Sequence, residues 1–229
     1  MLGWRDAMQQ ALYGPDGFYV RGPGPEAHFR TSVTASPLFA DAIRSLVVAA
    51  DDTLGRPARL DVVDVGAGDG SLLRAVAAGR TDDQQDRWRM CGVELRPRPS
   101  GLPPDLDWSH EPDDGLVGVV VAHELLDNVP LDVVEVTETG LRLVEVDEHG
   151  VEQLGGPPEA SELEWLAQWW PLAAAAPGDR AEVGRPRDQM WQQLLGRIER
   201  GVAVAVDYAH NREQRAAGGW AAGTLTGYR

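Results

Sequence analysis

The sequence predicts an α/β fold in which a largely parallel sheet lies between two layers of helices. Continuous runs rich in apolar residues at 60–65, 90–95 and 115–124, rather than alternating ones, are typical of parallel strands that are covered on both faces. Segments with apolar residues at helical spacing separate these runs. Shorter strand and helix patterns follow before a last Val-rich run at 201–208. We therefore expect one domain over residues 1–229 that carries an α+β insertion after its fourth strand.

The remaining elements follow from the same patterns. The expected order before the insertion is a helix at 4–12, a helix beginning at Pro37, the strand at 60–65, a helix at 71–79, the strand at 90–95, a strand near 102–108 and the strand at 115–124. The insertion, at 131–200, is expected to contain a hairpin around Thr139-Gly140 and amphipathic helices at 162–175 and 187–200. We expect this subdomain to serve a substrate or a partner protein.

Composition and charge exclude several classes of function. The formal charge of −15 argues against a broad nucleic-acid surface, and no run of about 18 apolar residues could span a bilayer. All 21 basic residues are arginine, so the chain has neither a P-loop lysine nor a Schiff-base lysine. A single cysteine, Cys91, and the lack of a secretory signal predict a cytoplasmic protein.

Three glycines, Gly66, Gly68 and Gly70, follow the strand at 60–65 and predict a turn that a ligand can approach closely. Their G-x-G-x-G spacing differs from the G-x-G-x-x-G of dinucleotide-binding turns, since Ser71 stands where that motif has its third glycine. Helix N-termini can bind phosphate through backbone donors alone. The spacing therefore weakens an NAD interpretation without removing it.

Acidic residues surround this turn. Asp64 and Asp69 would repel a pyrophosphate but suit a cationic sulfonium. Glu94 ends the second apolar run, where a carboxylate can accept both hydroxyls of an adenosine ribose. Strand, glycine turn, helix, strand and acid in this order indicate an adenosine-bearing cofactor. The alternative is a coincidental glycine-rich turn with a surface glutamate.

Several motifs, taken in order, resemble the Rossmann-like S-adenosylmethionine-dependent methyltransferases, and within them the MidA family. They are ALYGPDGFY (11–19), HFRTSVTASPLF (28–39), DVGAGDG (64–70), GVEL (92–95), AHELLDNVP (122–130), VDYAH (206–210) and GTLTGYR (223–229). Mitochondrial members of this family are assembly factors for respiratory complex I and protein-arginine methyltransferases. The resemblance implies a class I methyltransferase sheet, S-adenosyl-L-methionine as the cofactor and a protein arginine side chain as the substrate.

The resemblance also implies which residues bind the cofactor. Those at the glycine turn and the neighbouring strand end are Asp64, Gly66, Ala67, Gly68, Gly70, Glu94 and Leu95. Residues 1–36 are expected to cover the cofactor, with the hydroxyls of Thr31, Ser32 and Ser36 donating to its carboxylate. Capping of the helix at Pro37 is the alternative role for these hydroxyls.

Two further strand ends complete the expected crevice. Asp107 and Trp108 could bracket the adenine, with Asp107 accepting from its amino group, although a Trp at a strand end more often packs in a core. Asp207 and Tyr208 end the last Val-rich run and are expected to line the substrate side. No metal ligands are expected.

The segment HELLDN holds the candidates for catalysis. Glu124 and Asp127 stand three residues apart just past a strand end. Paired carboxylates suit an arginine substrate because they bind a guanidinium through bidentate hydrogen bonds and localise its charge. His123 could accept a proton. The alternatives are that Glu124 orients the loop and Asp127 starts a helix.

The chain departs from the family pattern at Asp64, His123 and Ala209, and it stops at Arg229 where members usually continue. We therefore expect a shortened C-terminal part of the fold and site. Two alternatives to an active methyltransferase stay open, namely a cofactor-binding, non-catalytic assembly factor and an NAD-dependent oxidoreductase. We expect a protein substrate and no nucleic-acid or membrane partner. A homodimer is left open.

Overall fold

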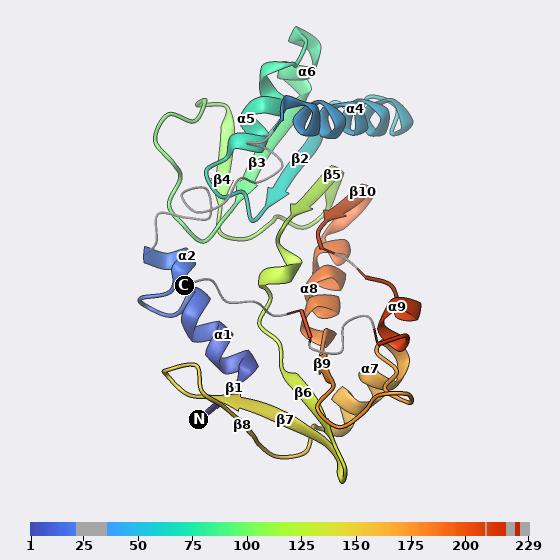
Figure 1. The fold of residues 1–229 in the computed structure, drawn as a ribbon. Coiled ribbons are helices and arrows are strands. Elements are labelled where there is room, and N and C mark those ends of the chain that lie inside the picture. Colours follow the sequence, from blue (N-terminus) through green and yellow to red (C-terminus); the bar gives the residue numbers. More distant parts are fainter. Residues whose placement is uncertain (22–35, 209, 219–222, 225–229) are drawn as a thin grey trace. The chain divides into compact units, whose positions relative to one another are not determined.

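The computed structural model describes residues 1–21, 36–208, 210–218 and 223–224 (Figure 1). The chain divides into two compact units. The first, here called the antiparallel unit, is made of Met1–Asp16, Val129–Gln189 and Tyr208–Arg229. The second, here called the parallel unit, is made of Gly17–Asn128 and Met190–Asp207. The sequence predicted one domain with an insertion at 131–200, whereas Met190–Asp207 group with the parallel unit and Met1–Asp16 with the antiparallel unit.

The parallel unit contains the sheet that the Val-rich runs predict. Its strands are β2 (Leu60–Val65), β3 (Trp88–Val93), β4 (Leu106–Ser109), β5 (Leu116–His123) and β10 (Ile198–Val206), in the order β10-β5-β2-β3-β4. Every pair of neighbours is parallel. The carboxyl ends of these strands therefore meet at one edge, which is where open α/β sheets bind their ligands.

Helices pack on both faces of the central strands of this sheet, as predicted, whereas no residue of β10 is buried. On one face, buried residues of α4 (Pro37–Thr53) and α5 (Ser71–Ala78) share a core with Leu60 and Val62 of β2. On the other face, Leu194 of α8 (Arg185–Gly196) packs with Val63 and Val65. Figure 1 shows α4 and α5 together beside β2 and β3. Because side chains of β2 pack against helices on both faces of the sheet, apolar residues occur at consecutive positions such as Val62 and Val63.

Two polar contacts anchor the helices of this unit. The Ser36 hydroxyl accepts a hydrogen bond from the backbone N–H of Leu38 (3.2 Å) and so caps α4, with Pro37 in its first turn. Buried Asp51 near the end of α4 accepts a bidentate pair from Arg87 (2.9 and 2.8 Å), which holds the pKa of that carboxyl below its usual range. Arg87 ends α6 (Asp82–Arg87). The short helix α2 (Phe18–Arg21) also belongs to this unit.

The boundary between α8 and β10 differs from the prediction. The sequence pattern predicted a helix over 187–200 and a strand from 201, but α8 ends at Gly196 and β10 begins at Ile198. Glycine lowers helix stability at that position, and a register shift between Ile198 and Arg200 lets the strand begin early. Within the described part of the chain, β10 has β5 as its one neighbour, and Val202 is 37% exposed.

The antiparallel unit contains the predicted hairpin, in which β6 (Val133–Thr137) pairs with β7 (Gly140–Val146). Its other elements are β1 (Leu2–Gly3), α1 (Trp4–Tyr13), β8 (Glu152–Leu154), α7 (Ala160–Trp169), β9 (Arg180–Glu182) and α9 (Arg212–Ala216). Buried apolar residues of β6, α7 and β9 form its main core. No helix of the described residues is long and apolar enough to span a bilayer.

Candidate active site

The glycine turn after β2 adopts a conformation that requires its glycines. Gly66, Gly68 and Gly70 have φ values of 78°, 58° and 75°, in the left-handed region that disfavours other residues. A Cβ on Gly66 would lie 3.0 Å from Cδ1 of Leu125, and one on Gly70 would lie 2.9 Å from Cδ2 of Leu102. The turn is therefore specified both by its backbone conformation and by its close packing.

Glu94, the residue after β3, lies against this turn. Its Oε2 accepts a hydrogen bond from the backbone N–H of Gly68 (2.9 Å), and its Oε1 accepts from those of Leu95 (2.8 Å) and Arg96 (3.2 Å). The Glu94 N–H itself donates to the carbonyl of Ser109 (3.0 Å). The structure thus brings together the glycines and the acid that the sequence analysis placed in one site, while their contact with a cofactor stays a prediction.

The acceptor capacity of Glu94 fits a ribose. An ionised carboxylate has about four acceptor positions, and the backbone takes three of them, two on Oε1 and one on Oε2. One position on Oε2 remains for a hydroxyl. The turn and the strand end therefore leave room for a hydroxyl of an adenosine sugar, and the contact of Glu94 with both ribose hydroxyls stays a prediction.

The acids at the turn have unequal surroundings. Asp69 accepts hydrogen bonds from the N–H and hydroxyl of Ser71 and thereby holds the start of α5. Asp64 is only 4% exposed, and none of the described residues donates a hydrogen bond to it. Burial, assisted by the charges of Glu94 and Asp69, raises the pKa of Asp64 to about 7. Its ionised form is poorly stabilised without a cation nearby.

Leu95 follows Glu94 after the end of β3, whereas Asp107 and Trp108 lie within β4. Leu95 is 55% exposed. The Asp107 carboxylate accepts from Nε of Arg89 (2.7 Å), which already occupies part of its capacity. Trp108 donates from Nε1 to the carbonyl of Arg96 (3.0 Å), and its ring covers Gly92. These contacts agree with the core alternative for Trp108, and adenine binding by this group stays a prediction.

His123 ends β5, and Glu124 begins the loop after it. Glu124 has a φ of 49°, which is uncommon for a residue other than glycine. Nε2 of His123 lies 3.4 Å from Oε1 of Glu124, and the imidazole ring packs against Phe39 with centroids 4.7 Å apart. Burial lowers the pKa of His123, opposed by the charges of Glu124 and Asp207. A neutral imidazole can accept a proton, and this role of His123 stays a prediction.

The loop after β5 contains Asp127, and the side chain of Asp207 contacts the backbone of this loop. Asp127 belongs to the 3₁₀ turn η2 (Leu126–Asn128), and its Oδ1 accepts from Nδ2 of Asn128 (2.8 Å). Oδ2 of Asp207, which follows β10, accepts from the backbone N–H groups of Leu126 (2.8 Å) and Asp127 (3.3 Å). Asp207 therefore contacts the loop backbone, which the sequence analysis did not foresee.

Three further predicted site residues stay predictions. Thr31 and Ser32 lie outside the described residues, as does part of the expected covering segment 1–36. Tyr208 is 76% exposed and belongs to the antiparallel unit. The sequence analysis also missed Asn128 and Phe39, although an Asn in a loop past a strand end is itself a signal for side-chain bonds to the backbone.

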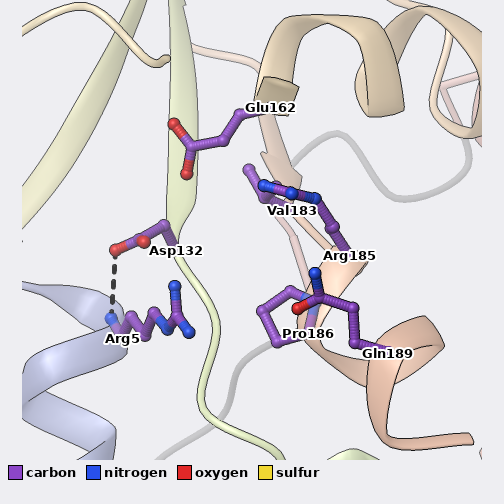
Figure 2. A pocket seen from close by; sticks show the side chains of 7 residues that line it. All are labelled: Arg5, Asp132, Glu162, Val183, Arg185, Pro186 and Gln189. Carbon is purple, nitrogen blue, oxygen red and sulfur yellow. Dashed lines mark hydrogen bonds between the residues drawn. The ribbon is translucent and has the colours of Figure 1, made fainter. Parts of the chain in front are cut away.

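A small polar cavity lies within the antiparallel unit (Figure 2). It has a volume of about 20 Å³, room for roughly one water molecule. Asp132 and Glu162 face it, and burial raises the pKa of both carboxyls. Asp132 accepts from the backbone N–H of Arg5 (3.2 Å). This cavity is too small for a cofactor.

Comparisons with known proteins agree with the geometry of the parallel unit. Residues 44–229 match the sequence profile of a family described as "Putative S-adenosyl-L-methionine-dependent methyltransferase". Because the match covers most of the chain, the chain belongs to this family of S-adenosyl-L-methionine-dependent methyltransferases. No curated protein matches the sequence.

Two solved structures from Burkholderia thailandensis have a similar fold. One, a superfamily member bound to S-adenosyl-homocysteine, is 23% identical with a TM-score of 0.73, and the match covers 91% of this chain and 58% of that one. The other, an uncharacterised protein of the same superfamily, is 26% identical with a TM-score of 0.69, and the match covers 91% and 57%. The chain thus spans less than three fifths of the length of these proteins.

Proposed function

We propose that this protein transfers a methyl group from S-adenosyl-L-methionine to an arginine side chain of a protein, as MidA-type methyltransferases do. The observation that carries the proposal is the meeting of Gly68 and Glu94 at the end of β2 and β3, with acceptor capacity left on Glu94. The acidic turn favours a sulfonium cofactor over a dinucleotide, because its carboxylates would repel a pyrophosphate.

The proposed cofactor site uses residues of the parallel unit. Glu94 accepts one ribose hydroxyl, the glycines at 66–70 allow close approach of the ligand, and Asp64 compensates the positive charge nearby. Leu95 and the side chains of Asp107 and Trp108 are assigned to the adenine, and Thr31 and Ser32 to the cofactor's carboxylate. When bound, S-adenosyl-L-methionine supplies an electrophilic methyl group on sulfur.

The proposed acceptor site is the loop after β5. Glu124 and Asp127 bind the guanidinium of the substrate through charge-assisted hydrogen bonds and orient one nitrogen. His123, neutral because it is buried, accepts the proton that the methylated nitrogen loses. We further assign recognition of the protein substrate to the insertion expected at 131–200. A homodimer would be compatible with each of these roles.

Labelling tests this proposal. The protein is incubated with S-adenosyl-L-methionine carrying a tritiated methyl group and with cell-extract proteins, and labelled acceptors are hydrolysed for amino-acid analysis. We expect tritium in methylarginine, and loss of the label when the Glu124→Gln variant replaces the unchanged protein. Tight binding of S-adenosylhomocysteine without any labelled polypeptide would instead favour the non-catalytic assembly factor. Binding of NAD but not of S-adenosylhomocysteine would favour the oxidoreductase.

A further inference from the structure

The loop at 124–128 is held in place by a residue that follows a different strand. Oδ2 of Asp207 accepts hydrogen bonds from the N–H groups of Leu126 (2.8 Å) and Asp127 (3.3 Å). Both N–H groups belong to the first residues of η2, where backbone donors have no partner within the turn. One carboxylate oxygen of Asp207 thus accepts from two N–H groups that have no partner within the turn.

The same loop adopts an unfavourable backbone conformation. Glu124 has a φ of 49°, and such a conformation costs a non-glycine residue on the order of 1 kcal/mol. Its N–H donates to the carbonyl of Val206 (2.8 Å), the residue before Asp207. Two consecutive residues at the end of β10 therefore hold the loop at both ends, since Val206 binds its first residue and Asp207 binds the turn.

Asn128 links the backbone of Glu124 to the side chain of Asp127. Its Nδ2 donates to the carbonyl of Glu124 (3.1 Å) and to Oδ1 of Asp127 (2.8 Å). The backbone of Glu124 and the side chain of Asp127 are thereby fixed relative to one another. A displacement of the turn would move both residues together, because one side chain bridges them.

We propose that Asp207 is a positioning residue for methyl transfer, which holds the loop 124–128 in the strained conformation that presents Glu124 and Asp127 to the substrate. This inference rests on the proposed function, because Glu124 and Asp127 are the acceptor site assigned there. It replaces the direct substrate contact that the sequence analysis expected of Asp207. The two roles differ in one respect, since a guanidinium requires the negative charge of Asp207 whereas backbone N–H groups require only an oxygen.

Two substitutions separate these roles. Asp207→Ala removes the acceptor, whereas Asp207→Asn keeps a carbonyl oxygen that can take both hydrogen bonds but removes the charge. Asp86→Ala, at an exposed position of α6, is the control for loss of a carboxylate elsewhere. Hydrogen exchange of the segment 122–130, followed by mass spectrometry, reports on the loop without any substrate.

We expect amide exchange of this segment to quicken about tenfold in Asp207→Ala, the effect of losing roughly one net hydrogen bond. Asp207→Asn and Asp86→Ala should exchange at the rate of the unchanged protein. Calorimetry should show the same affinity for S-adenosylhomocysteine in all of them. With the acceptor identified by labelling, kcat should fall about 10- to 100-fold in Asp207→Ala, recover in Asp207→Asn, and leave KM for the acceptor largely unchanged.

Other outcomes overturn the inference. Unchanged exchange in Asp207→Ala would show that Asp207 does not hold the loop. Loss of transfer in Asp207→Asn, with a raised KM and unchanged exchange, would show a direct contact with the substrate. If the unchanged protein labels no polypeptide, the proposed function fails on its own, and the exchange rates of the Ala and Asn variants still decide whether Asp207 holds the loop.

Discussion

The ends of β2 and β5 are neighbours in the parallel sheet, yet they are built in opposite ways. β2 contains a buried acid, Asp64, whose carboxylate accepts no hydrogen bond from a described residue, and the turn after β2 relies on glycines with positive φ. The loop after β5 places a glutamate at positive φ and ties it down with hydrogen bonds from Asn128 and to Val206. The two strand ends therefore differ in how their residues are held. The end of β2 leaves a buried carboxylate without a hydrogen-bond donor among the described residues, and the loop after β5 fixes its residues by hydrogen bonds.

The largest effect is expected from Glu94→Ala. This change leaves three backbone N–H groups near the strand ends without their acceptor and removes the proposed ribose contact. We expect the affinity for S-adenosylhomocysteine to fall about 100-fold, equivalent to about 3 kcal/mol, as measured by calorimetry. Glu111→Ala, at a side chain that is 82% exposed, is the control. Equal affinities in both variants would remove Glu94 from the site.

The second largest effect concerns Asp64 in β2 and the way the stability of the protein depends on pH. Asp64 has an ordinary pKa of 3.8 and a folded-state pKa of about 7, so between these values the folded protein holds more protons than the unfolded chain. The free energy of unfolding therefore falls as the pH rises through this range. Asp64→Asn should flatten this dependence and stabilise the protein by on the order of 2 kcal/mol at pH 8. Urea unfolding at several pH values measures it, and parallel curves for both proteins would contradict it.

The third prediction places a side chain in the glycine turn. Gly66→Ala should destabilise the protein by about 1–2 kcal/mol, because Ala is disfavoured at this φ and its Cβ would approach Leu125 to 3.0 Å. Gly150→Ala is a matched control, since Gly150 has the same φ of 78° but a Cβ added there would meet no atom within 4 Å. Chemical denaturation of both variants separates strain from packing. Equal losses of stability in the two variants would show that Leu125 moves away from the added Cβ at no cost in free energy.

The smallest effect is expected where a glycine replaces a residue that already has a positive φ. Glu124→Gly should raise the free energy of unfolding by up to about 1 kcal/mol, because glycine adopts positive φ without penalty. Methyl transfer should be lost in the same variant, since the carboxylate is removed. Glu124→Gln keeps the strained Cβ and should therefore lose transfer without gaining stability. A Gly variant no more stable than the Gln variant would show that the conformation at Glu124 stores no strain.

Much of the parallel unit could be predicted because its signals are local. Val-rich runs predicted parallel strands, the glycine turn predicted the βα connection, and Ser36-Pro37 predicted the start of α4, all of which the structure confirms. The end of α8 was predicted four residues late. The pattern of 187–200 is amphipathic throughout, and only pairing with β5 draws Ile198 into the sheet.

The site was harder to predict where contacts join distant segments. Glu94 could be placed because an acid at a strand end is a local signal, and it lies at Gly68 as expected. The partners of Asp107 and Asp207 could not be predicted. They are Arg89 and N–H groups of η2, which the packing of strands, and not spacing in the sequence, brings close. The positive φ of Glu124 left no trace in the sequence, because no glycine marks it.

The open side of β10 has a practical consequence. Its residues 201–206, GVAVAV, carry no charge, and within the described part of the chain the backbone on the side away from β5 has no strand partner. Unprotected strand edges recruit other chains, and natural proteins deter this with lysine, which this chain lacks altogether. We therefore expect this edge of the described part of the chain to favour aggregation in concentrated preparations. A single lysine at the exposed Val202 position is the change by which their shelf life should be extended.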